Sequence, residues 1–404
     1  MKKLLKSLSL ALIMSVSLLQ ITGCSKIVEE PEKEETAETF VVSEPEPEPI
    51  PEPESEPEPE PEPEVYTVTL CAVGDDLIHD NLISSGKKED GTRNYDHLYE
   101  HILDEIAPFD VKMINQETIL IDEPSEYSGY PRFGSPYEIG EAVVKAGFNV
   151  VTHATNHSYD KGEKGVLSTV AFWKEHPEVL MTGMYDNEED YQNISVGTFN
   201  NIRIAFLNYT YSLNGLSLPS DKQYYVNTLY DDDKIASDIQ KAREISDFVI
   251  VCPHWGTEYV YEATNYQRSE AQIFVDNGAD LIIGAHPHVV EPLEILFDEE
   301  GNEIPCYWSL GNYVSSQNEI PRMLGAMAKV TIEMTEGDER AHLVSCDMEP
   351  IVTHITSDCK SATTYMLKDY TEELAAEHRL TKTGKTITVE KMWELYESIT
   401  VSDE

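Results

Sequence analysis

The most constraining feature of this 404-residue chain is a set of polar side chains that follow directly after apolar, strand-like runs. The clearest run is Leu281–Ile283, which stops at Gly284 and is followed by His286 and His288. Residues at i and i+2 of extended backbone leave the same face, and two neutral imidazoles on a stiff loop suit a divalent metal. Taken alone, the pair is equally well explained as loop histidines hydrogen-bonded to backbone carbonyls. The residues at the other strand ends are needed to choose between the two interpretations.

The same pattern recurs at four further strand ends. In open α/β sheets the carboxyl ends of the strands line the functional crevice, so residues at successive strand ends come together. The residues in these positions are Asp75 and Asp76, Asn115 and Glu117, Asn156 and His157, His254, and His286 and His288. Carboxylate, amide and imidazole ligands together suit Mn, Fe or Zn better than Ca. The sequence therefore predicts a site for one or two divalent transition-metal ions.

Strand-like runs alternate with stretches of helical periodicity from residue 65 onward. The periodicity and its stop signals predict helices over residues 97–106, 137–146, 162–175, 232–245 and 266–277. Asn200-Asn201 tolerates positive φ and predicts a hairpin, and a second hairpin is expected across residues 298–302. Alternating strands and helices with hairpins at intervals indicate an α/β fold with a mixed sheet.

The N-terminal residues predict where the protein is located and not how it folds. Lysines precede an apolar stretch at residues 8–19, which is too short for a membrane span and is typical of a secretory signal. The residues before Cys24 resemble a bacterial lipobox, which implies cleavage after residue 23 and lipidation of the Cys24 thiol. The alternative is a signal that merely contains a cysteine.

Glu and Pro dominate the segment that follows Cys24, up to residue 64. Such a segment cannot bury a core and its like charges repel, so we expect a disordered, extended tether. Its expected purpose is to hold a folded domain away from the membrane, which makes the chain extracytoplasmic and lipid-anchored to the bacterial cell membrane. A polyproline ligand for another protein is the less favoured alternative.

Composition limits which partners the chain can bind and which state its cysteines adopt. The net charge of -46 argues against nucleic acid and against docking on anionic lipid, and it favours cation binding. Cys71 and Cys252 lie in apolar runs, where a small buried thiol is the expected state. Without CxxC spacing a disulfide framework is not predicted, although one bridge among Cys306, Cys346 and Cys359 stays open.

Combined, the motifs resemble the CapA family of capsule or poly-γ-glutamate synthesis proteins, within the calcineurin-like metallophosphoesterase superfamily. The motifs are Gly74-Asp75, Asn115-x-Glu117, Asn156-His157-x-x-Asp160-x-Gly162, His254-Trp255-Gly256-x-Glu258-Tyr259, His286-Pro287-His288 and Ser309-Leu310-Gly311-Asn312. The resemblance covers about residues 67–316. It implies the calcineurin-like metallophosphoesterase fold, an α/β two-sheet α/β/β/α sandwich, with a dinuclear metal centre.

This resemblance and the composition divide the chain into four expected parts. Residues 1–23 form a lipoprotein signal peptide, and residues 24–64 form the lipidated cysteine and the Glu/Pro tether. Residues 65–325 form a CapA-like metallophosphoesterase domain, on which C-terminal strands and helices of residues 326–404 pack.

The resemblance also implies roles for individual residues. The expected metal ligands are Asp75, Glu117 (with Asn115 as its alternative), Asn156, His254, His286 and His288. His157 matches the proton donor beside the metal, with Asp160 orienting its imidazole, although His157 could instead cap a loop. Leu77 stands where the superfamily has a histidine, which leaves one metal poorly ligated and makes a mononuclear site an alternative.

Two further residues are candidates for substrate binding. Arg132 is a lone cation in an acidic body and could grip a phosphate or carboxylate in bidentate fashion, with a surface ion pair as the alternative. Asn312 is expected to hydrogen-bond a ligand loop or the substrate. The remaining histidines, including His79, His153 and His354, are expected on the surface or on helices.

Three functions follow as hypotheses. The first is a metal-dependent, phosphoesterase-like hydrolase that acts on a phosphoester or a related bond of an envelope polymer. The second is a non-catalytic accessory protein that binds an anionic polymer such as polyglutamate, and the third is an amide hydrolase of that polymer. A capsule synthase complex is an expected partner, while the sequence specifies neither the polymer, the metal nor the oligomeric state.

Overall fold

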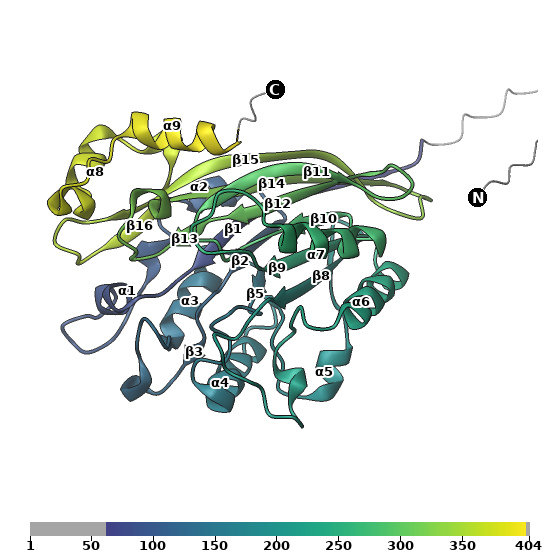
Figure 1. Ribbon diagram of the computed structural model, residues 1–404, viewed down its shortest axis with the longest axis horizontal. Coiled ribbons are helices and arrows are strands. Elements are labelled where there is room, and N and C mark those ends of the chain that lie inside the picture. Colours follow the sequence, from purple (N-terminus) through teal and green to yellow (C-terminus); the bar gives the residue numbers. More distant parts are fainter. Residues whose placement is uncertain (1–61, 401–404) are drawn as a thin grey trace, which may run out of the picture. The chain divides into compact units, whose positions relative to one another are not determined.

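Two β-sheets form the centre of residues 62–400, the part of the chain that the computed structural model describes (Figure 1). The predicted signal peptide, the lipidation at Cys24 and nearly all of the Glu/Pro tether lie outside the described residues. The predicted two-sheet α/β sandwich is confirmed by the strand orders given below.

The first sheet has eight strands in the order β16-β15-β14-β1-β2-β5-β6, with β13 paired to the end of β1. Its strands are β1 (Val65–Asp76), β2 (Val111–Asn115), β5 (Val150–Thr152), β6 (Leu180–Thr182), β13 (Asn312–Val314), β14 (Leu324–Thr335), β15 (His342–Ile355) and β16 (Ala362–Met366). Strands β1, β2, β5 and β6 run parallel, whereas β14 pairs antiparallel with β1 from Val65 to Val73. The late strands therefore extend the same sheet, and a domain boundary at 325–326 stays a prediction.

The second sheet has six strands in the order β11-β12-β10-β9-β8-β7. They are β7 (Ser195–Phe199), β8 (Ile202–Thr210), β9 (Phe248–His254), β10 (Leu281–Ile283), β11 (Val290–Phe297) and β12 (Glu303–Leu310). Both predicted hairpins are present, and Asn200 and Asn201 have φ values of 43° and 67°, as the turn requires. The carboxyl ends of the parallel strands β8, β9 and β10 point the same way.

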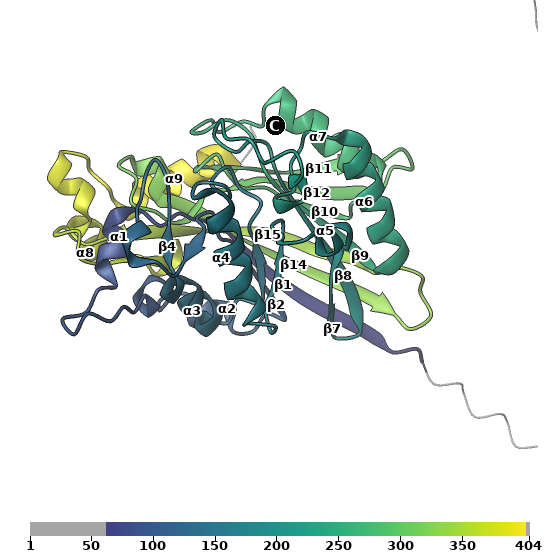
Figure 2. The same ribbon diagram turned by 90° about the horizontal axis from the view of Figure 1, so that it is seen from below.

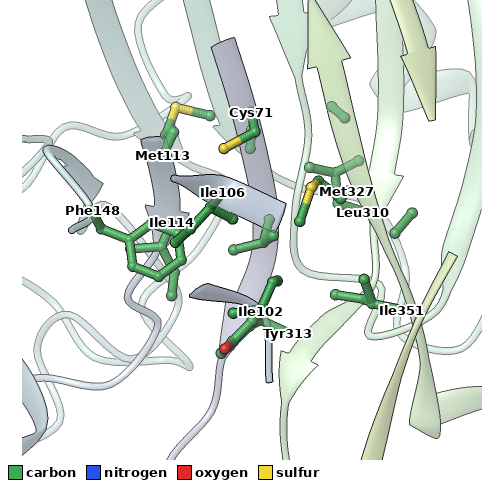
Figure 3. Packing of buried hydrophobic residues seen from close by; sticks show 14 of the residues in the cluster. Cys71, Ile102, Ile106, Met113, Ile114, Phe148, Leu310, Tyr313, Met327 and Ile351 are labelled. Carbon is green, nitrogen blue, oxygen red and sulfur yellow. The ribbon is translucent and has the colours of Figure 1, made fainter. Parts of the chain in front are cut away.

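The main core is the layer between the sheets, and it follows from the two-residue period of the strands. In β8, Ile204 and Phe206 pack toward the first sheet, while Ala205 and Leu207 pack against helices on the other face. Figure 3 shows part of the main hydrophobic cluster, where Cys71 and Met113 lie among apolar side chains from several elements. Burial on both faces explains why these strands read as continuous apolar runs.

Helices cover the outer sides of the strands (Figures 1 and 2). The remaining elements are α1 (Asp80–Ser85), α2 (Leu103–Ile106), β3 (Leu120–Ile121), β4 (Ser135–Pro136), α3 (Tyr137–Ala146), α4 (Gly162–Lys174), α5 (Glu188–Gln192), α6 (Asp232–Ile245), α7 (Asn265–Asp276), α8 (Glu372–Glu377) and α9 (Val389–Thr400). Helices α6 and α7 pack on the six-stranded sheet, whereas α3 joins the core of the eight-stranded one. None of the helices within residues 62–400 is long and apolar enough to cross a membrane.

Four of the predicted helices are confirmed to within one residue at each end, and one is wrong. Residues 97–106 form a 3-10 turn at Asp96–Leu98 and the short helix α2 instead of one helix. Tyr99 and Ile102, between these two pieces, are fully buried, and the Tyr99 hydroxyl donates to Asp76 Oδ2 at 3.0 Å. Packing under β1 therefore overrides the helical periodicity of this stretch.

Candidate metal centre

The predicted residues meet where the carboxyl ends of β1, β2, β9 and β10 converge. Asp75, at the end of β1, accepts a hydrogen bond from Asn115 Nδ2 at 2.8 Å. The same carboxylate lies 3.9 Å from His254 Nδ1 and 3.0 Å from His288 Nδ1. Two strands from each sheet thus bring their terminal side chains to one point, as the strand-end pattern predicts.

Glu117 and the histidine pair form the densest part of the cluster. One ligand atom each from Glu117, His286 and His288 lies within 4.8 Å of the other two. Glu117 Oε1 is also 3.8 Å from His254 Nε2. These four residues are at most 3% exposed, so their polar groups are withdrawn from water.

Asn156 and His157 complete the cluster from the loop after β5. Asn156 Oδ1 lies 3.1 Å from His254 Nε2, and His157 Nε2 lies 3.9 Å from Glu117 Oε1. His157 Nδ1 contacts Asp160 Oδ2 at 2.7 Å, and this oxygen also accepts the backbone N–H of Phe133. Asp160 therefore fixes the orientation of the His157 imidazole, and a catalytic role of the pair stays a prediction.

Unpartnered buried atoms show that the cluster fits a metal ion. Both carboxylate oxygens of Glu117 and both ring nitrogens of His286 are buried without a hydrogen-bond partner among residues 62–400. Buried polar atoms are normally paired, because burying one alone costs about 1–3 kcal/mol. Oxygen and imidazole nitrogen donors together suit Mn, Fe or Zn, so the donor set agrees with a divalent transition metal.

The electrostatics of the cluster also favour a cation. Burial holds the pKa values of His254 and His286 well below their usual range, so both imidazoles are neutral and free to ligate. Burial raises the pKa of the Glu117 carboxyl well above its usual range, with the Asp75 charge contributing. Although burial opposes charging of His288, Glu117 and Asp75 raise its pKa to about 9. A proton on His288 thus partly neutralises the two carboxylates.

The loop that carries His286 and His288 is not the extended segment expected from the sequence. Both histidines have left-handed backbone, with φ values of 101° and 58°. Such conformations cost on the order of 1–3 kcal/mol each and persist where the surroundings enforce them. Here a Cβ on Gly284 would lie 2.1 Å from the Trp308 carbonyl oxygen, and Leu310 N donates to Gly284 O. Close backbone contact with β12 therefore holds the loop in this shape.

Asn312 and Arg132, the two candidate substrate-binding residues, differ in their placement. Asn312 is fully buried, with its Oδ1 3.1 Å from His288 Nδ1 and its Nδ2 donating to the His288 carbonyl. It therefore holds the His288 ring in place, and a role in substrate binding stays a prediction. Arg132 is exposed, and its guanidinium has no ion pair within residues 62–400, so its substrate role stays a prediction.

Three further residues lie near the cluster. Leu77 replaces an expected histidine, and the sequence did not predict the positions of Tyr211 and His79. Leu77 is 2% exposed and offers no ligand atom where the superfamily has a histidine. The ring of Tyr211 lies 4.6 Å from that of His286, and burial raises the pKa of its hydroxyl to about 12. His79, expected on the surface, packs edge-on against Phe133 at 5.3 Å. Tyr211 follows a strand end like the ligands do, but an aromatic side chain gives no metal signal.

Comparison with known proteins decides the family. Residues 69–317 match the bacterial capsule synthesis protein family PGA_cap. The chain belongs to this family. The capsule biosynthesis protein CapA of Bacillus anthracis is 26% identical over 305 residues, which cover 70% of this chain and 72% of that protein. The PGA biosynthesis protein CapA of Bacillus subtilis (strain 168) is 33% identical over 171 residues, 42% of this chain and 43% of that protein.

The PGA_cap chain is also similar to solved phosphoesterase structures. A phosphatase from Mycoplasma pneumoniae is 13% identical with a TM-score of 0.45, and the match covers 72% of this chain and 95% of that one. The calcineurin-like phosphoesterase YfkN from Bacillus subtilis is 12% identical with a TM-score of 0.37, over 71% and 91% of the two chains. The assignment of the fold rests on the two sheets themselves, and these likenesses add no argument about activity.

Proposed function

We propose that this PGA_cap-family chain is a metal-dependent hydrolase that takes part in the synthesis of capsule or another envelope polymer. The observation that carries the proposal is the set of buried, unpartnered ligand atoms on Glu117 and His286, within 4.8 Å of a ligand atom of His288. The residues that would hold the metal are Asp75, Glu117, Asn156, His254, His286 and His288. A metal ion bound there supplies Lewis acidity toward a scissile ester or amide.

The chain's own residues supply the proton chemistry. His157 Nδ1 is held by Asp160, which leaves Nε2 directed toward the cluster, 3.9 Å from Glu117 Oε1. In this position His157 Nε2 can deliver a proton to a leaving group. The Phe133 ring packs edge-on against the His157 ring at 4.5 Å and shields it from water.

The substrate we propose is an anionic envelope polymer such as polyglutamate, or a phosphoester formed during its synthesis, and not a nucleic acid. The names of the two CapA relatives, which refer to capsule and PGA biosynthesis, support this class. A capsule synthase complex is the partner that we infer. Lipidation at Cys24 would hold the protein on the outer face of the bacterial cell membrane.

One observation favours a second function, a non-catalytic accessory protein that binds the polymer. Leu77 is buried where a metal-binding histidine is expected, so the chain has fewer ligands than a full dinuclear centre needs. A protein that retains a metal for structure or for polymer binding requires no second ion.

Metal content is the first test of the proposal. Full-length protein should hold about one divalent transition-metal ion per chain or more, and His288→Ala should lose it, because metal binding needs the deprotonated ligands together. His342→Ala is the matched control, since His342 is an exposed histidine on β15. Wild-type protein without metal would end the hydrolase proposal.

Hydrolysis separates the candidate functions once metal is present. Metal-loaded protein is incubated with an aryl phosphate and, separately, with polyglutamate. We expect turnover of one of them, and Asp160→Asn should lower it about 10–100-fold, as loss of an orienting partner does, at unchanged metal content. Metal without turnover of either compound would favour the accessory protein.

Membrane attachment has its own test. Cys24→Ser should move the protein from the membrane fraction to the soluble envelope fraction, because a lipid chain on Cys24 would no longer be attached. Retention of the variant on the membrane would contradict the proposed anchor.

A further inference from the structure

Arg322 is an arginine with free donors close to the metal centre. It lies in the 3-10 turn Ile320–Met323, between β13 and β14 and beyond the residues that match the family. Its side chain is half-buried, and its Cζ lies 3.4 Å from the centroid of the Tyr259 ring. Within residues 62–400 the guanidinium makes no ion pair and no hydrogen bond, so stacking on Tyr259 is its chief restraint.

Tyr259 is hydrogen-bonded to the loop that carries the candidate ligands His286 and His288. Its backbone N–H donates to the Pro287 carbonyl at 2.8 Å, and its ring centroid lies 6.1 Å from that of His288. Tyr259 is 37% exposed, whereas the neighbouring His288 is 3% exposed, so Tyr259 lies on the solvent side of this contact. Left-handed backbone at Tyr259, with φ 68°, shows that the surrounding loops hold the residue in place.

The backbone of Arg322 is tied to the same ligand from the other side. Its carbonyl accepts a hydrogen bond from Asn312 Nδ2 at 3.0 Å, and Asn312 Oδ1 lies 3.1 Å from His288 Nδ1. The guanidinium and the metal centre are therefore held by one hydrogen-bonded and stacked network, in which His288 is common to both connections.

The charge balance of the chain makes this placement unusual. The chain carries 75 acidic against 29 basic residues, and many of its described lysines and arginines pair with carboxylates. Stacking on a tyrosine ring leaves the edges of a guanidinium free, and those edges match the oxygens of a phosphate or a carboxylate in bidentate fashion. In such an acidic protein an unpaired arginine beside the centre attracts anions to that one place.

We propose that Arg322, stacked on Tyr259, binds an oxyanion of the substrate beside the metal centre. The inference rests on the proposed function and assigns its substrate a phosphate or carboxylate group next to the bond that is cleaved. Arg322 is the substrate-binding residue, and Tyr259 is a positioning residue that acts through it. Exposed Arg132 stacks on no aromatic ring within residues 62–400.

Anion binding by the full-length, metal-loaded protein tests this proposal. The probes are inorganic phosphate and a γ-linked glutamate oligomer, measured separately by equilibrium dialysis, and the probe that binds identifies the source of the oxyanion. Arg322→Ala should weaken its binding about ten- to hundredfold, because one or two charge-assisted hydrogen bonds are lost. Arg322→Lys should restore only part of the affinity, since an ammonium cannot bind in bidentate fashion.

Two controls separate an anion-binding role from a structural one. Arg340→Ala removes the same charge from an exposed position in the β14–β15 turn and should leave anion affinity unchanged. Metal content should stay at the wild-type level in every Arg322 variant, and where turnover is present KM should rise more than kcat falls. Equal anion affinity in wild type and Arg322→Ala, or no binding of either probe to the wild type, would overturn the proposal.

Failure of the Arg322 oxyanion site can be distinguished from failure of the hydrolase proposal. If the wild type holds no metal, the proposed hydrolase fails, and Arg322-dependent anion binding by the metal-free protein still supports the oxyanion site. If the wild type holds metal and hydrolyses a substrate while Arg322→Ala leaves KM unchanged, the oxyanion site fails alone.

Discussion

Two buried histidine clusters in this protein have opposite chemistry. The metal-centre cluster contains His254, His286 and His288 with the carboxylates of Asp75 and Glu117. The second, which we call the C-terminal cluster, contains His354, Tyr370 and His378 at 4%, 4% and 0% exposure. Burial is therefore nearly equal in the two places.

Hydrogen bonding separates the clusters. In the C-terminal cluster His354 Nδ1 lies 2.9 Å from the Tyr370 hydroxyl, and His378 Nε2 lies 3.2 Å from the Thr353 carbonyl oxygen. In the metal centre both nitrogens of His286 lack any partner within residues 62–400. Buried histidines alone thus do not indicate a metal site. Unpartnered imidazole nitrogens beside buried carboxylates do, because such an arrangement is costly unless a cation completes it.

The largest expected effect is stabilisation of the protein by metal. A ligand that binds only the folded state, at a thousand times its Kd, raises the free energy of unfolding by about 4 kcal/mol. We expect this gain for wild type when Mn²⁺ or Zn²⁺ is added after chelation, and no gain for His286→Ala. Chemical unfolding of the full-length protein with and without metal measures the difference.

The matched variant for this experiment is His354→Ala, which truncates an equally buried histidine of the C-terminal cluster. It should lower the stability of the metal-free protein and keep the full gain on adding metal. Loss of the gain in His354→Ala, or its survival in His286→Ala, would contradict the distinction between the two clusters.

The sequence predicts which of these residues come together, because strand ends carry their own signal. An apolar run that stops before a polar ligand residue is local, and parallel strands bring those ends together whatever lies between them. His286, His288 and Glu117 are found in this way. The left-handed backbone of His286 was not predicted, since it results from contact of Gly284 with β12, which is distant in sequence.

The C-terminal cluster was not predicted for the same physical reason. His354 lies within β15 and His378 follows α8, and no local pattern shows that the two rings pack at 5.5 Å. Both histidines were expected on the surface or on helices, and burial proves this wrong. The broken helix at residues 97–106 is a similar case, because buried Tyr99 is drawn to Asp76 by tertiary packing.

Two histidines, one from each cluster, should also respond to pH with opposite sign. In the metal-free protein the pKa of His288 is raised to about 9, so its stabilising effect is complete below pH 6.5 and is lost as pH rises toward 9. Burial lowers the pKa of His354 to about 4, so its effect is complete above pH 6.5 and is lost as pH falls toward 4. Each effect should amount to about 3 kcal/mol.

Urea unfolding of the chelated protein across this range measures both limbs. Many other groups titrate, so the comparison is between wild type and a variant at each pH. His288→Asn should flatten the alkaline limb only, and His354→Phe should flatten the acidic limb only. The same pH profile in wild type and His288→Asn would show that Glu117 and Asp75 do not hold a proton on that imidazole.

The smallest expected effect is the loss of a single hydrogen bond. His354→Phe keeps an aromatic ring against Tyr365 and His378 but removes the bond with the Tyr370 hydroxyl, which should cost about 1 kcal/mol. His286→Phe replaces a ring whose nitrogens have no partner within residues 62–400, so it should cost the metal-free protein less. The measurement is the urea midpoint of both chelated variants at pH 7, where His286 and His354 are neutral. If His286→Phe destabilises the metal-free protein more than His354→Phe does, the His286 nitrogens have hydrogen-bond partners even without metal. That result would contradict the difference in hydrogen bonding between the two clusters.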